Sequence, residues 1–222
     1  VNIDDGVWDT SATTTAVDFC RDQLKRNLTA GYPSNRPFRD TSDPGNSYLH
    51  RLFGNEERFK RVVRTIREAT NTHALSVLDT GSGQGTALDE LLDSYPGFFD
   101  PDNSVGLSLP LPIDLDQFSD KVIFANILHC GAKTKFDLVM NVQGAFSYHP
   151  FHFAPAHAAS GLVLLHAISL VKNGGVLAIM PFYSNITQEF VRKGILKKIA
   201  RTNCYQVLRE ATVEEVFDFL KK

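Results

Sequence analysis

Ser76-Val-Leu-Asp-Thr-Gly-Ser-Gly-Gln-Gly-Thr86 is a segment in which an apolar run stops at an acid and continues into three glycines spaced two residues apart. Val77 and Leu78 favour a strand, and helical spacing of leucines resumes after Thr86. Glycine adopts backbone angles that are closed to residues with a Cβ. The segment therefore predicts a strand, a tight turn and a helix start, with room for a ligand directly against the backbone of the turn.

The order of the glycines argues against two common nucleotide-binding patterns. A dinucleotide fingerprint has the order G-x-G-x-x-G, but here the third glycine is Gly85 and the sixth position is Thr86. A phosphate loop of the type G-x-x-x-x-G-K-[ST] is not met either, because no Lys follows Gly85. What remains is an acid, Asp79, followed by glycines at every second position, a pattern that is weak when taken alone.

The composition is that of a globular protein. The chain has 222 residues, 43% of them hydrophobic and 22% charged, which suits one domain plus an extension. A net charge of -2 gives no electrostatic reason to expect nucleic acid or an acidic membrane as a partner. Three scattered cysteines suit reduced thiols, and no apolar run approaches the roughly 18 residues that span a bilayer. We therefore expect a cytoplasmic protein without a metal centre or a membrane segment.

The first quarter of the chain differs in composition from the rest. We expect residues 1–54 to form an N-terminal helical and loop extension, and residues 55–222 to form the main domain. Apolar spacing predicts a helix over 13–28. The segment 29–47 is rich in Gly and Pro and is expected to be a packed loop that could act as a lid. A second helix is expected over 56–72, with a basic face toward water.

Strand signals recur after the quoted segment. Strands are expected at 105–109, 121–126, 136–142 and 176–181, with a helix over 156–171. Beyond them we expect a helix over 188–200, a strand over 205–209 and a helix over 213–220. Alternating strands and helices predict an α/β fold with a doubly wound, mostly parallel sheet. In such a sheet the ligand lies beyond the carboxyl ends of the strands, near the point where the strand order reverses.

Three segments together resemble class I, Rossmann-like S-adenosylmethionine-dependent methyltransferases. They are the acid and glycine pattern from Asp79 to Gly85, Phe136-Asp-Leu-Val-Met-Asn-Val-Gln143, and Leu170-Val-Lys-Asn-Gly-Gly-Val-Leu177. Their spacing is similar to that of the family. The resemblance implies that residues 55–222 form a Rossmann-like cofactor-binding domain. It also implies S-adenosyl-L-methionine as the cofactor and methyl transfer to a small-molecule or protein acceptor.

The resemblance also implies which residues bind the cofactor. They are Asp79, Gly81, Ser82, Gly83 and Gly85 at the methionine end, Ser108 and Leu109 at the ribose, Asn126 and Ile127 at the adenine, and Asn141 and Gln143 at the end of the fourth strand. The family usually has an acid at the end of the second strand, and this chain has Ser108 there. A hydroxyl lacks the bidentate, charge-assisted hydrogen bonds of a carboxylate. Some small-molecule-modifying members, such as those resembling cyclopropane synthases, also carry a hydroxyl residue at this position.

The acceptor side rests on the segment after the fourth strand. It lacks the N-P-P-Y pattern that resembles amide or adenine N-methyltransferases, which disfavours methylation of DNA bases. His149 and Tyr148 are the catalytic candidates: a neutral imidazole can take a proton from an acceptor, and an aromatic ring can wall a pocket or face a sulfonium. The alternative is that His149 is a surface or packing residue. The spacing of His149, His152 and His157 does not suit a metal site.

Two other functions remain open at the level of sequence. A methyltransferase-like fold that has lost catalysis would be a binding or regulatory module, which Ser108 favours and the intact glycines oppose. An NAD-dependent oxidoreductase would require an acid after the second strand and another glycine order.

Overall fold

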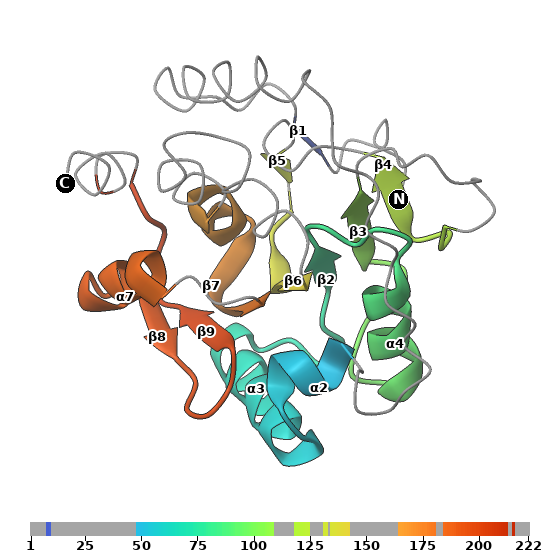
Figure 1. Cartoon of the computed structure of the whole chain (residues 1–222), viewed down its shortest axis with the longest axis horizontal. Coiled ribbons are helices and arrows are strands. Elements are labelled where there is room, and N and C mark those ends of the chain that lie inside the picture. Colours follow the sequence, from blue (N-terminus) through green and yellow to red (C-terminus); the bar gives the residue numbers. More distant parts are fainter. Residues whose placement is uncertain are drawn as a thin grey trace.

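A seven-stranded sheet forms the centre of the structure (Figure 1). The computed structural model describes residues 8–9, 48–108, 118–124, 131–132, 134–142, 164–180, 184–212 and 215. In spatial order the strands are β4 (Val122–Phe124), β3 (Val105–Ser108), β2 (Val77–Asp79), β6 (Phe136–Val142), β7 (Val171–Met180), β9 (Cys204–Val207) and β8 (Leu196–Lys198). The first five strands in this order, β4, β3, β2, β6 and β7, pair in parallel, and β9 runs antiparallel to both of its neighbours. The predicted α/β fold with a doubly wound, mostly parallel sheet is confirmed.

The strand order reverses between β2 and β6. From β2 the chain proceeds to β3 and β4 on one side, and it then returns to β6 and continues to β7 on the other. Leu78 pairs with Val139 and Asp79 with Met140 across this junction. All seven residues of β6 are buried, as expected for a central parallel strand covered on both faces. The carboxyl ends of β2 and β6 therefore form the switch point at which open α/β sheets bind ligands.

Helix α3 (Glu56–Thr70) has clear start and stop signals. The Asn55 side chain accepts a hydrogen bond from the Arg58 N–H (2.9 Å), and two glutamates occupy the first turn. Asn71 ends the helix in the left-handed conformation (φ 53°), with its N–H on the Arg67 carbonyl (3.0 Å). The helix predicted over 56–72 is confirmed and ends two residues earlier.

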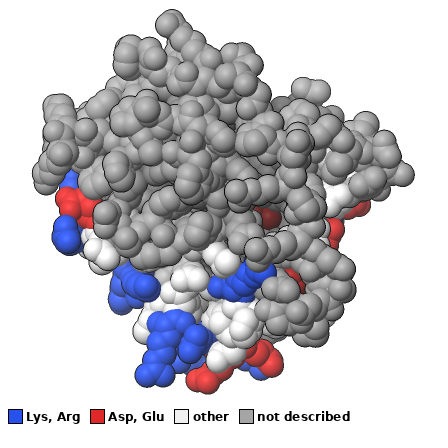
Figure 2. Space-filling model, in the orientation of Figure 1, with Lys and Arg blue, Asp and Glu red and all other residues white. Residues whose placement is uncertain are grey.

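The outer face of α3 carries both signs of charge. Lys60 lies 2.7 Å from Glu56 and Arg61 lies 3.6 Å from Glu57, each one helical turn away. Figure 2 shows the same mixture, with Lys and Arg beside Asp and Glu along the lower edge of the view. These exposed pairs contribute little to stability, and the basic face expected from the sequence is a solvated one.

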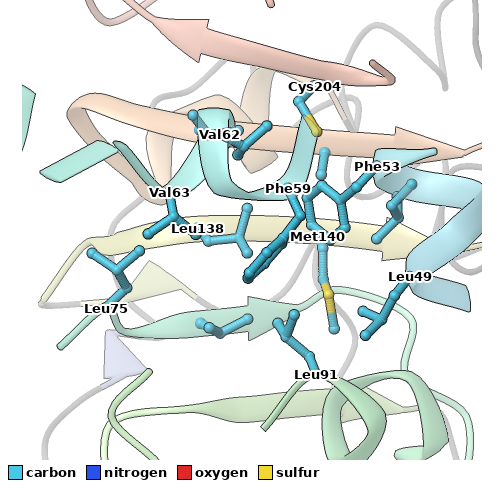
Figure 3. Packing of buried hydrophobic residues seen from close by; sticks show 14 of the residues in the cluster. Leu49, Phe53, Phe59, Val62, Val63, Leu75, Leu91, Leu138, Met140 and Cys204 are labelled. Carbon is cyan, nitrogen blue, oxygen red and sulfur yellow. The ribbon is translucent and has the colours of Figure 1, made fainter. Parts of the chain in front are cut away.

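Helix α2 (Tyr48–Phe53) packs on the same core as α3 and is held at both ends. The Tyr48 N–H donates to Glu90 Oε2 (3.1 Å), on α4 (Thr86–Ser94). At the other end Asn203 donates from Nδ2 to the Arg51 carbonyl (3.1 Å) and from its N–H to the Leu52 carbonyl (3.2 Å). Figure 3 shows side chains from α2, α3 and β6 packed together over the sheet, Phe53, Phe59 and Met140 among them.

The expected extension 1–54 is described only in part. Besides α2, the two residues of β1 (Trp8–Asp9) pair antiparallel with β5 (Gly131–Ala132). The expected helix over 13–28 and the loop over 29–47 lie outside the described residues. The boundary at residue 54 stays a prediction.

The fifth strand begins earlier than predicted. The helix expected to reach residue 171 is helical over 164–169, and β7 starts at Val171, which pairs with Phe136. The pairing with β6 is irregular between Phe136 and Leu138, and Gly174 adopts a left-handed φ of 82°. Gly174 and Gly175 are therefore part of an irregular strand. Residues 156–163 of the expected helix lie outside the described residues.

The helix predicted over 188–200 is confirmed over 188–192 and wrong beyond it. Helix α7 (Ser184–Arg192) is followed two residues later by a glycine, Gly194, with φ 66°. The Gly194 N–H donates to the Val191 carbonyl (3.1 Å) and the Ile195 N–H to the Phe190 carbonyl (3.0 Å), which is a Schellman motif. The chain then continues as β8. The strand predicted over 205–209 is β9, and the helix predicted over 213–220 lies outside the described residues except for residue 215, which is helical.

Candidate functional site

The loop between β2 and α4 straddles the switch point. The Thr80 N–H donates to the Met140 carbonyl of β6 (2.9 Å), and the Ser82 N–H donates to the Leu107 carbonyl of β3 (2.9 Å). The Gly85 N–H closes the turn on the Ser82 carbonyl (2.9 Å). The loop is thus fixed to the strands on both sides of β2, at their carboxyl ends.

Two glycines of the loop have left-handed backbone angles, Gly83 with φ 56° and Gly85 with φ 98°. A Cβ on Gly85 would also lie 2.6 Å from the Cβ of Ser119 and 2.9 Å from Val122 Cγ2. The Ser119 N–H in turn donates to the Gln84 carbonyl (2.8 Å). Backbone conformation and close packing both require glycine at position 85.

Asp79 lies at the foot of the loop and is 1% exposed. Its Oδ1 accepts a hydrogen bond from the Gly81 N–H (3.3 Å), so the carboxyl caps the turn. Its Oδ2 is buried and has no partner among the described residues. Burial raises the pKa of Asp79 to about 7, although the Gly81 hydrogen bond lowers it in part.

Asn141 is the next-to-last residue of β6 and is fully buried. Because Asp79 pairs with Met140, Asn141 lies on the other face of the sheet. Its Nδ2 donates to Thr80 Oγ1 (3.0 Å), and that hydroxyl donates to the Met140 carbonyl (3.2 Å). Because the hydroxyl proton is directed at Met140, the amide nitrogen of Asn141 is the atom that faces Thr80. Asn141 Oδ1 is left as a buried acceptor without a partner in the described part of the chain.

A third buried polar atom, Ser82 Oγ, lies against β3. A Cβ on Gly106 would be 2.5 Å from Ser82 Oγ and 2.7 Å from Ser82 Cβ, so only glycine fits at that position of the strand. Ser82 Oγ also has no hydrogen-bond partner within the described ranges. Ser108, which ends β3, is 5% exposed.

These three atoms decide which ligand the site could bind. Buried polar groups are almost always hydrogen-bonded, so atoms without a partner at a switch point are candidate ligand contacts. Asp79 Oδ2 and Asn141 Oδ1 accept hydrogen bonds, and the buried carboxyl disfavours a phosphate. Asp137 Oδ1 and Arg67 Nε also lack partners, but they lie at the start of β6 and in α3. The residues fit a ligand with positively charged or neutral donors.

Seven of the predicted cofactor residues meet at the carboxyl ends of β2, β3 and β6: Asp79, Gly81, Ser82, Gly83, Gly85, Ser108 and Asn141. Their roles stay predictions. The other predicted residues, Leu109, Asn126, Ile127, Gln143, Tyr148 and His149, lie outside the described residues, as do His152 and His157.

Two residues of the site were not predicted, Thr80 and Gly106. The signal for Gly106 was a glycine inside a strand pattern, which often marks close approach of another backbone. Thr80 stands inside the first segment quoted, but only the pairing of β2 with β6 reveals its contact with Asn141.

In the part of the chain that the structure describes, no group of three or more His, Cys, Asp or Glu side chains could hold a metal ion. A separate search of those same residues finds no helix with the length and apolar character to cross a membrane.

Comparison with known proteins gives distant structural likenesses. No protein-family model and no curated protein matches the sequence. Among solved structures, the chain is similar to the sugar N-methyltransferase KedS8 from Streptoalloteichus, at 21% identity over 70% of this chain and 60% of that one, with a TM-score of 0.44. It is also similar to CalS10, an amino pentose methyltransferase from Micromonospora echinaspora, at 19% identity over 66% of this chain and 60% of that one, with a TM-score of 0.41. The chain is similar as well to DesVI from Streptomyces venezuelae, at 18% identity over 67% of this chain and 61% of that one, with a TM-score of 0.39.

The chain therefore spans about 60% of the length of each of the first two proteins and 61% of the third. At this level of similarity the likenesses do not assign the chain to a family.

Proposed function

We propose that the protein binds S-adenosyl-L-methionine and transfers its methyl group to a small-molecule or protein acceptor. The observation that supports this most is the pair of buried acceptor atoms, Asp79 Oδ2 and Asn141 Oδ1, beside a glycine loop at the switch point. Glycine loops that bind phosphate offer N–H groups and cations, whereas this loop has a buried carboxyl at its foot. An ammonium group satisfies such acceptors and a phosphate does not.

The chain's own residues would bind and orient this ligand. Asp79 would accept from the ammonium of the methionine part, and the loop around Gly83 would leave space for the ligand against its backbone. The bound cofactor would supply a methyl group on a positively charged sulfur. Transfer is an in-line displacement, so alignment of the two reactants can supply much of the rate. His149 stays our candidate for the group that takes a proton from the acceptor.

The pKa of Asp79 makes this binding dependent on pH. A cationic ligand binds the ionised carboxyl, and the pKa of about 7 means that the carboxyl becomes protonated as the pH falls through neutrality. Affinity for S-adenosylmethionine should therefore fall by up to about tenfold for each pH unit below 7. Titration calorimetry at pH 8, 7 and 6 measures this, and Asp79→Asn should bind weakly with no such dependence.

Binding is tested by calorimetric titration with S-adenosylmethionine and S-adenosylhomocysteine. Gly83→Asp should abolish binding, because its side chain fills the space above the loop. Gly97→Asp is the matched control: Gly97 also has a left-handed φ (81°), and a Cβ there meets nothing within 4 Å. No heat from the unaltered protein at millimolar ligand contradicts the proposal.

The second candidate is a catalytically inactive, methyltransferase-like binding or regulatory module. Ser108 favours it, because the end of β3 offers a hydroxyl in place of the family's usual acid. Mass spectrometry of the denatured, freshly purified protein distinguishes the two functions. A retained S-adenosyl nucleoside supports the enzyme, whereas a degenerate site should be recovered empty.

We also propose a cytoplasmic location. Cys204 is a free, buried cysteine, and burial raises the pKa of its thiol to about 12. An inert thiol of this kind suits a reducing compartment.

A further inference from the structure

Three cations at the β8 edge of the sheet have no acidic partner. Several other cations of the protein are paired, such as Arg192 with Glu189 on α7 (3.1 Å). Arg58, Lys197 and Arg201 take part in no ion pair within the described part of the chain. Neighbouring like charges without counterions repel one another, so a group of them indicates a surface for an anionic partner.

Arg58 lies on the flank of α3 that faces β9. Val62, one turn further along this flank, packs in the same core cluster as Cys204 of β9 (Figure 3). Ala69, two turns further still, lies against β7, because a Cβ on Gly174 would be 2.6 Å from the Ala69 Cβ. The outer face of α3 pairs its cations with glutamates, whereas Arg58 on this flank has none.

Lys197 lies on the same face of the sheet, on the outermost strand. It pairs with Gln206 of β9, which is two residues from Cys204 and therefore faces the same side. Because β8 is the last strand beyond β9, α3 does not cover it, and Lys197 is exposed. Arg58 and Lys197 thus border the same strip of the sheet from its two sides.

The turn between β8 and β9 brings Arg201 to this region. Asn203 fixes the turn by hydrogen bonds to two carbonyls of the last turn of α2 (3.1 and 3.2 Å). A Cβ on Gly54, directly after α2, would lie 2.6 Å from Arg58 Nη1, so this guanidinium also lies at the end of α2. Arg201 and Arg58 therefore approach the same helix end from two different elements.

We call these cations the basic patch, which comprises Arg58, Arg61, Lys197 and Arg201. Arg61 is included because it is one helical turn from Arg58 and its ion pair with Glu57 is long (3.6 Å) and exposed. Figure 2 shows Lys and Arg side chains over α3 and the neighbouring hairpin of β8 and β9. The patch itself contains no aromatic side chain on which a base could stack and no apolar side chain that could enter a membrane.

We propose that the basic patch binds a short acidic segment of a partner protein. The net charge of the whole chain is -2, so the surface beyond the patch is on balance negative and repels a long polyanion such as nucleic acid. A segment with a few carboxylates stays within the patch and avoids this repulsion. Three of the four cations are arginines, whose planar guanidinium groups match carboxylates through paired hydrogen bonds.

The patch is separate from the candidate cofactor site. Strands β7 and β9 lie between β8 and β6, which places β8 about 14 Å from the switch point within the sheet. Binding of an acidic segment therefore does not depend on the proposed function, and the two can be tested separately.

The test is fluorescence anisotropy with a labelled hexaglutamate peptide, at about 50 mM and about 200 mM salt. The unaltered protein should bind this peptide and lose most of the affinity at the higher salt, because exposed charges are screened. A labelled hexaglutamine peptide and a single-stranded oligouridine should both bind more weakly than hexaglutamate.

Two double variants with the same net charge show whether the patch is the binding site. Lys197→Gln with Arg201→Asn removes two cations of the patch, and asparagine tolerates the left-handed φ of position 201 (62°). It should bind hexaglutamate about fivefold more weakly, as expected for two exposed ion pairs. Lys60→Gln with Arg192→Gln removes two cations elsewhere and should change the affinity by less than about twofold. Melting curves verify that both variants are folded.

A loss confined to the patch variant supports the proposal. Equal losses in the two double variants overturn it, because net charge would then explain the binding. Tighter binding of oligouridine than of hexaglutamate also overturns it and assigns the patch to nucleic acid. If hexaglutamate causes no change in anisotropy at the lower salt, the patch does not bind acidic segments, while the proposed function stands.

Discussion

The Asp79 carboxyl is buried at the end of β2, and burial raises its pKa from 3.8 to about 7. Between these two values the folded protein holds a proton that the unfolded chain has released. The free energy of unfolding therefore falls as the pH rises through this window, by roughly 4 kcal/mol in total. Without a ligand, the ionised carboxyl at neutral and higher pH lowers the stability of the fold.

Asp79→Asn should remove this penalty in the ligand-free protein. The amide is nearly isosteric with the carboxyl and has no charge to bury. The free energy of unfolding of the variant, relative to that of the unaltered protein, should therefore rise by roughly 3 kcal/mol from pH 5 to pH 8. Urea unfolding at the two pH values measures the difference. Asp93→Asn, at an exposed position of α4, controls for loss of a charge. An equal effect of Asp79→Asn at both pH values would contradict the buried, titrating carboxyl.

At the residue scale, the sequence predicted the parts of the site that follow one another along the chain. Asp79 and the glycines lie in one segment, and these residue types predict a turn that a ligand can approach. Gly106 and Thr80 could not be assigned in this way. Their roles depend on contacts with Ser82 and Asn141, which arise only when β3 and β6 are placed on either side of β2.

Asp137 ties three strands together at the opposite edge of the sheet. From β6, its Oδ2 accepts from the Ser76 N–H (3.0 Å), the Ser76 hydroxyl (2.9 Å) and Lys172 Nζ of β7 (2.9 Å). Lys172 neutralises this carboxylate, whose side chain is 1% exposed.

Asp137→Ala should destabilise the protein by about 3 kcal/mol, because it leaves three donors without their common acceptor. Lys172→Met should cost less, since the two Ser76 donors remain. Urea unfolding measures both losses, and Asp102→Ala, on the exposed turn before β3, is the control. A loss below 0.5 kcal/mol for Asp137→Ala, on the order of an ordinary surface change, would show that the three strands do not depend on this carboxylate.

The turn between α7 and β8 distinguishes the observed structure from the helix expected over 188–200. Gly194 has φ 66°, and no atom lies within 4 Å of the position that a Cβ would take there. An alanine therefore makes no clash, and its only cost is the strain of the left-handed backbone conformation. Gly194→Ala should therefore destabilise the protein by about 1 kcal/mol. In a continuous helix the same change would be stabilising. Thermal unfolding of the variant decides between the two by the sign of the shift.

At the scale of the whole molecule, the parallel half of the sheet was predictable and the rest was not. Strands β2, β3 and β6 are buried throughout, so each reads as a short apolar run between turn signals. The antiparallel pairing of β9 with β7 and β8 is set by contacts distant in sequence, such as Leu177 with Tyr205. The apolar spacing of Leu49, Leu52 and Phe53 was the signal that α2 belongs to the core.

Helix α2 also bears on how the molecule unfolds, because it lies inside the expected extension 1–54 and yet packs on the main core. Phe53 is 1% exposed, and its ring lies 5.2 Å from that of Phe59 in an edge-to-face arrangement. Phe53→Ala should therefore lower the free energy of unfolding of the whole α/β domain by about 4 kcal/mol, in one transition. Leu208→Ala, at a side chain that is 46% exposed, should change it by less than about 0.5 kcal/mol. Urea unfolding followed by circular dichroism tests this, and a variant that loses helical signal while the main transition stays in place would show that the extension is a separate unit.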